Sequence, residues 1–406
     1  MKKLLKKIPG IDVPNIRLYY LFSYIHDSFF TEGNWIFLFL MYFSYTELGI
    51  IDAIALCLGM LLEIPSGAFA DLLGKKKTIQ LSFLIVFISL ITMSLANSSL
   101  VLFSSNLLLF TGLALYSGTA EAFAYDSLID NKSKYGFDKV YSFSISIKAI
   151  AFIIAAGIGA IAASYNPRLP FLLWALTFLI GTISSFKMTE PKVDTIKFSW
   201  KNYWLQTRTG FKQLLRPVLK PYFILIIILL GVDYLYGWGF MKPAILLEFQ
   251  FDALSMGAIF VIYGIISAIT INYLPKFRKK ISDFSAILGL GAIMVLCLIM
   301  FSTNNQIIAF LAAILMSLAG TFTYSWITII INEQTPSMYR ATTLSTIAML
   351  IKLPLILLSP LAGLIVDSGY LKMLLGAIAI IVSLTLLYST ISNRSPIKTN
   401  NLSDKY

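Results

Sequence analysis

Charged residues and cysteines are both scarce in this sequence of 406 residues. Only 13% of the residues are charged, against about 25% in a typical soluble domain, and 58% are hydrophobic. The two cysteines, Cys57 and Cys297, fall inside apolar runs, so we interpret them as small apolar fillers and neither as a disulfide nor as a metal pair. The composition excludes a soluble domain and indicates an integral membrane protein.

Residue sets that support catalysis or nucleotide binding are also missing. A single histidine, His26, leaves no Ser/His/Asp set and no metal cluster. The segment from Gly67 to Gly74 can look like a phosphate loop, but its glycine spacing is too long and Lys76 stands where a hydroxyl residue is required. We therefore expect no enzymatic activity, no metal and no cofactor, and a gradient of protons or another ion as the energy source.

Twelve apolar runs have the length of about 20 residues that a membrane-spanning helix needs. The predicted spans are 16–43, 48–70, 78–97, 100–128, 139–164, 169–188, 219–246, 253–275, 284–303, 306–332, 341–366 and 370–391. This pattern predicts an all-α polytopic membrane protein with two six-helix halves, residues 1–188 and 219–392. Residues 189–218 link the halves, and residues 393–406 form a polar tail.

Positive charge is concentrated in alternate gaps between the predicted spans. The net charge is +12, and of the 32 Lys and Arg residues the opposite loops hold only Arg168, Lys242 and Lys372. This bias follows the positive-inside rule, so we expect both termini to be cytoplasmic and no nucleic-acid partner. The abundance of Ile, Lys and Asn is typical of an AT-rich bacterium, which places the multi-pass protein in a bacterial inner (plasma) membrane.

The linker at residues 189–218 alternates basic and aromatic residues, such as Lys197, Trp200, Lys201 and Trp204. An amphipathic helix of this kind would lie on the cytoplasmic leaflet. A flexible basic linker is an equally compatible interpretation.

Two lysines lie at matched positions in the two halves. The offset that aligns Lys148 with Lys352 also aligns Gly159 with Gly363. A lysine in the hydrocarbon layer is costly and is therefore a functional candidate. Matched lysines in two halves indicate a duplicated protein with a site between the halves, an arrangement typical of secondary transporters.

The first span carries three titratable residues that are candidates for proton coupling: His26, Asp27 and Glu32. Burial raises the pKa of a carboxylate towards neutrality and a nearby lysine lowers it, so such an acid can exchange protons. His26 could titrate in the same range, or could serve only as a hydrogen-bond partner of a neighbouring helix.

Candidates for substrate binding are spread over both halves. They are Asp233, Glu121, Lys148, Lys352, Trp35 and Trp238. Counting residues from the helix ends places Asp27, Glu121 and Lys148 at one depth, so Lys148 is expected to pair with Glu121 or Asp27. For both lysines a purely structural ion pair is the alternative to substrate binding.

The sequence between the second and third spans, GAFADLLGKKK at residues 67–77, resembles motif A of the major facilitator superfamily, G-x-x-x-D-R/K-x-G-R-K/R. The matching residues are Gly67, Asp71, Gly74, Lys75 and Lys76. Leu72 stands where the family usually has a basic residue. The resemblance implies that spans one, four, seven and ten line a central cavity, and that Asp71 meets the positive end of span eleven and latches the halves on the cytoplasmic side.

The same resemblance implies transport by alternating access. We expect a monomer in the lipid bilayer that moves a small molecule, with proton-coupled efflux of amphipathic, drug-like compounds as the first hypothesis. The alternative is a specific carrier, by symport or export, of an anionic or zwitterionic metabolite, a peptide or a lipid-like compound. The lysine pair favours this alternative.

Overall fold

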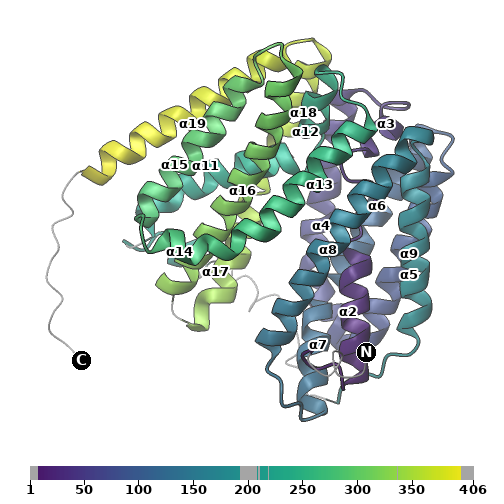
Figure 1. Ribbon diagram of the computed structural model, residues 1–406. Helices are drawn as coiled ribbons and strands as arrows, with labels where there is room; N and C mark the ends of the chain where they lie inside the picture. The colour runs from purple at the N-terminus through teal and green to yellow at the C-terminus, as the bar shows by residue number, and fades with distance from the viewer. Residues whose placement is uncertain (1–7, 193–207, 209–210, 218, 336, 395–406) are drawn as a thin grey trace, which may run out of the picture.

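The computed structural model describes residues 8–192, 208, 211–217, 219–335 and 337–394 (Figure 1). Inside helices, the side chains of residues 63–73, 337–342, 345, 393 and 394 are outside this description. The described residues contain no strand, and ten helical segments among them are long and apolar enough to cross a membrane. The prediction of an all-α polytopic membrane protein is confirmed.

The helices form two groups that lie side by side in Figure 1. The first group comprises α2 (Pro14–His26), α3 (Trp35–Phe39), α4 (Tyr45–Leu73), α5 (Lys75–Ser94), α6 (Ser99–Tyr116), α7 (Thr119–Asp130), α8 (Phe137–Tyr165) and α9 (Leu169–Ser185). The second comprises α11 (Lys220–Gly237), α12 (Met241–Glu248), α13 (Ala253–Thr270), η1 (Ile271–Tyr273), α14 (Leu274–Arg278), α15 (Asp283–Met300), α16 (Gln306–Gln334), α17 (Ser337–Leu350), α18 (Leu353–Asp367) and α19 (Leu371–Arg394).

Several predicted spans are interrupted, which corrects the expectation of continuous helices. The first span breaks between α2 and α3, the fourth between α6 and α7, the seventh between α11 and α12, and the eleventh between α17 and α18. Gly33 and Gly118, both at φ +74°, mark two breaks, and Pro354 in the first turn of α18 lacks the N–H that would continue a helix. Such irregular backbone is tolerated at membrane depth only where protein buries it or where it lines a cavity.

The two groups meet along two helix pairs, α4 with α18 and α8 with α13. In Figure 1 the groups converge on the side that holds α3 and α12, and they diverge towards the side where α2 begins. We call these the distal side and the terminal side. Of the broken spans, the eleventh lies directly at this junction, because α18 packs on α4.

Glycines bring the paired helices into backbone contact. A Cβ atom on Gly49 of α4 would lie 2.2 Å from the carbonyl oxygen of Ser359, and one on Gly363 of α18 would lie 2.1 Å from that of Tyr45. On the other pair, a Cβ on Gly257 of α13 would lie 2.1 Å from the Cβ of Ala160. Small residues therefore permit the close helix approach that membrane interfaces use in place of a hydrophobic driving force.

Most of the predicted amphipathic linker lies outside the described residues, as does nearly all of the polar tail. Residues 211–214 are helical, and the ring of Phe211 lies 6.0 Å from that of Phe223 on α11. The amphipathic helix over residues 189–218 and the domain boundaries drawn from the sequence stay predictions.

Candidate functional site: a central cavity of mixed charge

A cavity of about 670 Å³ lies where the broken spans of the two groups meet. The first span contributes Phe29, Glu32 and Trp35, and α11 contributes Asp233 and Tyr234. Further wall residues come from α8, α12, α13, α16 and α17, and are Phe152, Lys242, Phe260, Tyr263, Ser317, Thr321, Tyr324 and Ala348. The cavity is therefore shared by both groups of helices.

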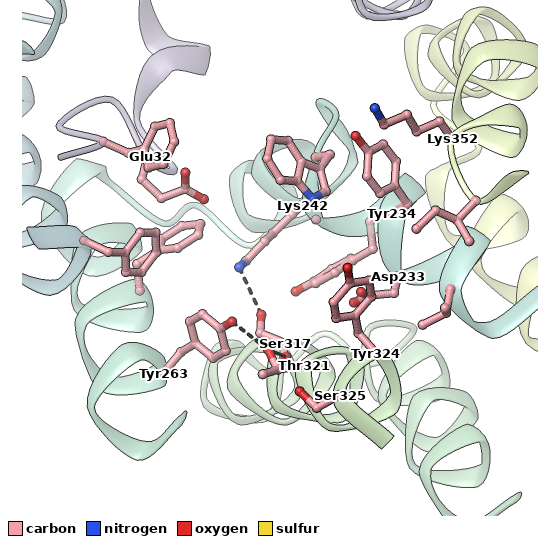
Figure 2. A pocket seen from close by; sticks show the side chains of 18 of the residues that line it. Glu32, Asp233, Tyr234, Lys242, Tyr263, Ser317, Thr321, Tyr324, Ser325 and Lys352 are labelled. Carbon is pink, nitrogen blue, oxygen red and sulfur yellow. Dashed lines mark hydrogen bonds between the residues drawn. The ribbon is translucent and has the colours of Figure 1, made fainter. Parts of the chain in front are cut away.

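Lys242 is the most buried charge in this cavity, which corrects its assignment to an outer loop. It belongs to the first turn of α12, directly after the break that follows α11, and is 4% exposed. Its Nζ donates a hydrogen bond to Ser317 Oγ at 3.0 Å and lies 3.8 Å from the centre of the Phe260 ring (Figure 2). A charge count cannot separate a loop lysine from one on a helix that turns back into the bundle.

Two carboxylates flank Lys242 in Figure 2, Glu32 from the break after α2 and Asp233 from α11. Both attract Lys242 electrostatically, yet no described carboxylate oxygen lies within 4.0 Å of its Nζ. One cavity thus holds Lys242, Glu32 and Asp233 without a direct ion pair among these three residues. Burial of such charges costs free energy unless a partner compensates them.

Gly320 on α16 makes room for Asp233. A Cβ atom at Gly320 would lie 1.7 Å from Asp233 Oδ1 and 2.4 Å from its Cγ. Because no side chain fits there, the Asp233 carboxylate lies flat against the α16 backbone. The sequence alone gave no signal for this contact, since it joins helices far apart in the chain.

Aromatic rings form much of the cavity wall. Trp238 is 64% exposed and stacks on Tyr234, with ring centres 5.5 Å apart and planes at 15°. Trp35 packs edge-on against Phe39, and the Tyr263 hydroxyl shares a hydrogen bond of 2.7 Å with Thr321. Trp35 and Trp238, both predicted as binding residues, line the cavity.

The matched lysines occupy different surroundings. Lys352 lies at the break between α17 and α18 and lines the cavity, whereas Lys148 lies inside the unbroken helix α8 and is absent from the cavity wall. Pro354, two residues after Lys352, accounts for the difference, because it has no N–H to donate to the carbonyl of Leu350, where α17 ends. The alignment suggested one role for both lysines, but the two side chains lie in different parts of the structure.

Lys148 instead belongs to a second polar cluster within the first group of helices. Its Nζ lies 3.7 Å from Asp27 Oδ2 and 3.8 Å from Glu121 Oε1, so both predicted pairings occur. The Nδ1 of His26 lies 2.9 Å from Asp27 Oδ2, and its ring stacks on Tyr116 at 4.5 Å. Glu121 and Lys148, predicted to bind substrate, do not line the cavity. Asp27 is also absent from the cavity wall, which includes Glu32, its predicted partner in proton coupling.

The motif at residues 67–77 spans the end of α4 and the start of α5 on the terminal side. Gly74, at φ +89°, forms the junction, and the backbone N–H groups of Lys75 and Lys76 each donate to the Glu190 carboxylate at 2.7 Å. The Lys75 ammonium is buried in an ion pair with Asp126. The side chain of Asp71 lies outside the described set, so the latch assigned to Asp71 stays a prediction.

The sequence missed Glu190, which is the first acid after α9. Its two bonds satisfy backbone donors at the start of α5 that no helical carbonyl can reach. An acid soon after a span and near a lysine-rich turn is the only signal that could have indicated it.

The comparisons with known proteins agree with this architecture. The family model of the Major Facilitator Superfamily matches residues 18–357. The chain belongs to the Major Facilitator Superfamily. It is therefore a multi-pass membrane protein of a transporter superfamily. One curated relative, the uncharacterized MFS-type transporter YxaM of Bacillus subtilis (strain 168), is 23% identical over 248 residues, which cover 59% of this chain and 60% of that protein.

Solved structures of other transporters share the fold at low sequence identity. The nucleoside transporter NupG aligns with a TM-score of 0.74 at 14% identity, over 94% of this chain and 98% of its own. The POT family transporter PepTSo aligns with a TM-score of 0.70 at 10% identity, over 94% and 98%. A POT family transporter in complex with 5-aminolevulinic acid aligns with a TM-score of 0.69 at 13% identity, over 92% and 95%.

Proposed function

We propose that this protein carries a small zwitterionic solute with a planar or aromatic portion through the central cavity by alternating access. The proposal rests on one observation: a single cavity holds Lys242, Glu32 and Asp233, and among the described residues none of these three charges forms an ion pair. A solute with a carboxylate and an amine supplies a partner for each sign of charge. The aromatic walls supply flat apolar contact.

The mixed charge favours this specific carrier over the efflux of lipophilic cations. A lipophilic cation has no carboxylate to offer Lys242, and at 4 Å with an effective dielectric constant of 20 the ion pair that it cannot form is worth about 4 kcal/mol. Such a cost corresponds to roughly a thousandfold in affinity. The presence of 5-aminolevulinic acid, which bears an amine and a carboxylate, in a transporter of the same fold supports the same substrate class.

The second polar cluster is the place where we propose that ions couple to transport. This cluster joins three elements of the first group through His26, Asp27, Glu121 and Lys148. None of these four residues belongs to the cavity wall, so a proton can bind at the cluster while the solute is bound in the cavity. We propose cytoplasmic termini and a bacterial inner membrane on the strength of the positive-inside bias.

The test uses purified protein in liposomes and three related compounds: 5-aminolevulinic acid, levulinic acid without the amine, and the methyl ester without the free carboxylate. We expect only the zwitterion to bind well, and Lys242→Gln to weaken it at least a hundredfold while the ester is unaffected. Lys372→Gln is the matched control, because this lysine is only partly buried, lies outside the cavity wall and donates a hydrogen bond to the exposed Asn304. Equal binding of all three compounds, or accumulation of tetraphenylphosphonium under a pH gradient, would return the assignment to efflux of lipophilic cations.

A further inference from the structure

A carboxylate from the second group of helices caps a helix of the first group on the distal side. Asp367, the last residue of α18, accepts the backbone N–H groups of Tyr45 at 3.0 Å and Thr46 at 2.8 Å, and the Thr46 hydroxyl at 2.6 Å. These donors form the first turn of α4, which already has a capping box between Ser44 and Glu47. The N-terminus of α4 thus receives one acid from its own group and one from the other.

A second carboxylate on α4 makes the reverse contact. Asp52, about two turns further along α4, accepts the N–H of Phe240 at 3.1 Å in the break between α11 and α12. A Cβ atom on the preceding Gly239 would lie 3.0 Å from Asp52 Oδ2, so the glycine keeps this approach open. Asp52 therefore satisfies a donor that the broken helix leaves without a helical partner.

These two carboxylates lie at either end of a close-packed stretch of the seam between α4 and α18. Gly49 and Gly363 lie along the same stretch, each against a carbonyl oxygen of the opposite helix. Atoms at such distances cannot stay in contact when the two helices separate, so the bonds of Asp367 and Asp52 form and break together with the seam.

The other seam is built differently. The N-terminus of α13, which packs on α8, is capped by Asp252 of its own chain segment, whose carboxylate accepts the Ser255 N–H at 2.8 Å. That bond survives any movement of α13 relative to α8, because both partners move with one helix.

We infer that Asp367 and Asp52 form a distal latch, which holds the two groups together on the distal side while they diverge on the terminal side. The latch rests on transport by alternating access but on no particular substrate. It uses the chemistry predicted for Asp71, a carboxylate against a helix terminus, at the opposite end of α4. Rocking of the halves then exchanges one latch for the other.

The test measures the distance between spin labels on the distal side in the full-length protein without substrate. Labels are placed at Asn97→Cys and Ser302→Cys, two exposed positions in the α5–α6 and α15–α16 turns, after Cys57→Ser and Cys297→Ser. We expect Asp367→Asn to raise the ratio of long to short distances about tenfold, because bonds to a charged acceptor become bonds to a neutral one. Asp52→Asn should shift the ratio in the same direction.

Asp252→Asn is the matched control, since it removes a distal helix-capping carboxylate that does not cross between the groups. Thr46→Val deletes one bond of the latch without touching Asp367 and serves if Asp367→Asn does not fold. An unchanged distribution in Asp367→Asn and Thr46→Val, or an equal shift in Asp252→Asn, would overturn the latch. Because the readout needs no solute, a failed search for a zwitterionic substrate leaves the result unaffected.

Discussion

Gly320→Ala offers a sharp test of the cavity, because one added methyl group displaces one defined charge. Its Cβ would lie 1.7, 2.4 and 2.9 Å from Oδ1, Cγ and Oδ2 of Asp233, so the whole carboxylate must leave its position. Leaving a favoured rotamer costs about 0.5–1.5 kcal/mol, and the loss of a charged hydrogen bond to a substrate amine costs about 1.5–3 kcal/mol. Together these costs of about 2–4.5 kcal/mol predict a loss of about 30-fold to 2,000-fold in affinity for the zwitterion.

The assay compares binding of 5-aminolevulinic acid and levulinic acid to the purified protein. We expect Gly320→Ala to weaken the first and to spare the second, which has no amine for Asp233 to bind. Gly289→Ala is the matched control, because it lies on the neighbouring α15 with open space around the new methyl group. Helix propensity favours alanine over glycine by about 1 kcal/mol, so a general loss of folding is not the expected cause.

A combination with Asp233→Asn makes the reasoning refutable. If Gly320 acts only through Asp233, the double variant should bind no worse than Asp233→Asn alone, since the displaced group has already lost its charge. Additive losses would show that the methyl group acts elsewhere in the cavity, and unchanged binding in Gly320→Ala would show that Asp233 takes no part in recognition.

Two further predictions concern the other polar groups. Asp71→Asn should slow transport by about tenfold and leave the affinity for the solute nearly intact. Uptake into the same liposomes measures the first quantity, and solute binding measures the second. An equal loss of binding would show that Asp71 does not act as the predicted latch. Lys148→Gln leaves Asp27 and Glu121 without their shared cation. Uptake driven by a pH gradient should therefore fall at least tenfold, while solute exchange without a gradient continues. A parallel loss of both activities would show that Lys148 has a structural role and does not couple ions to transport.

The pairing of Lys148 shows how far residue counting can go. Depth along a helix follows from a rise of about 1.5 Å per residue, so the level shared by Asp27, Glu121 and Lys148 could be predicted from the spans. Glu32 was placed in the proton-coupling set with Asp27 only because both are acids on the first span, and that role stays a prediction. Its position in the cavity wall beside Lys242 follows from the break after α2, and a break of this kind depends on the packing of neighbouring helices.

The symmetry of the lysines shows where sequence comparison stops. Lys148 and Lys352 match in position, but Pro354 and the glycine contacts of α18 place Lys352 at a helix break that α8 lacks. Lys242, the central cation of the cavity, has no matching lysine in the first half and was counted as a loop residue. Its burial depends on the turn between α11 and α12. A hydropathy pattern does not reveal this turn, because hydropathy is averaged over a window longer than the turn.

The sequence by itself determined that this protein is an all-α polytopic membrane transporter of the Major Facilitator Superfamily. Apolar length and the residues of motif A are local properties, and the cost of exposing backbone to lipid leaves the helix as the structure for each span. Only the tertiary structure decided which charges share the central cavity and which acids join the two groups of helices. Those contacts join residues from helices far apart in the chain, and they depend on where helices break and how closely glycines let them approach.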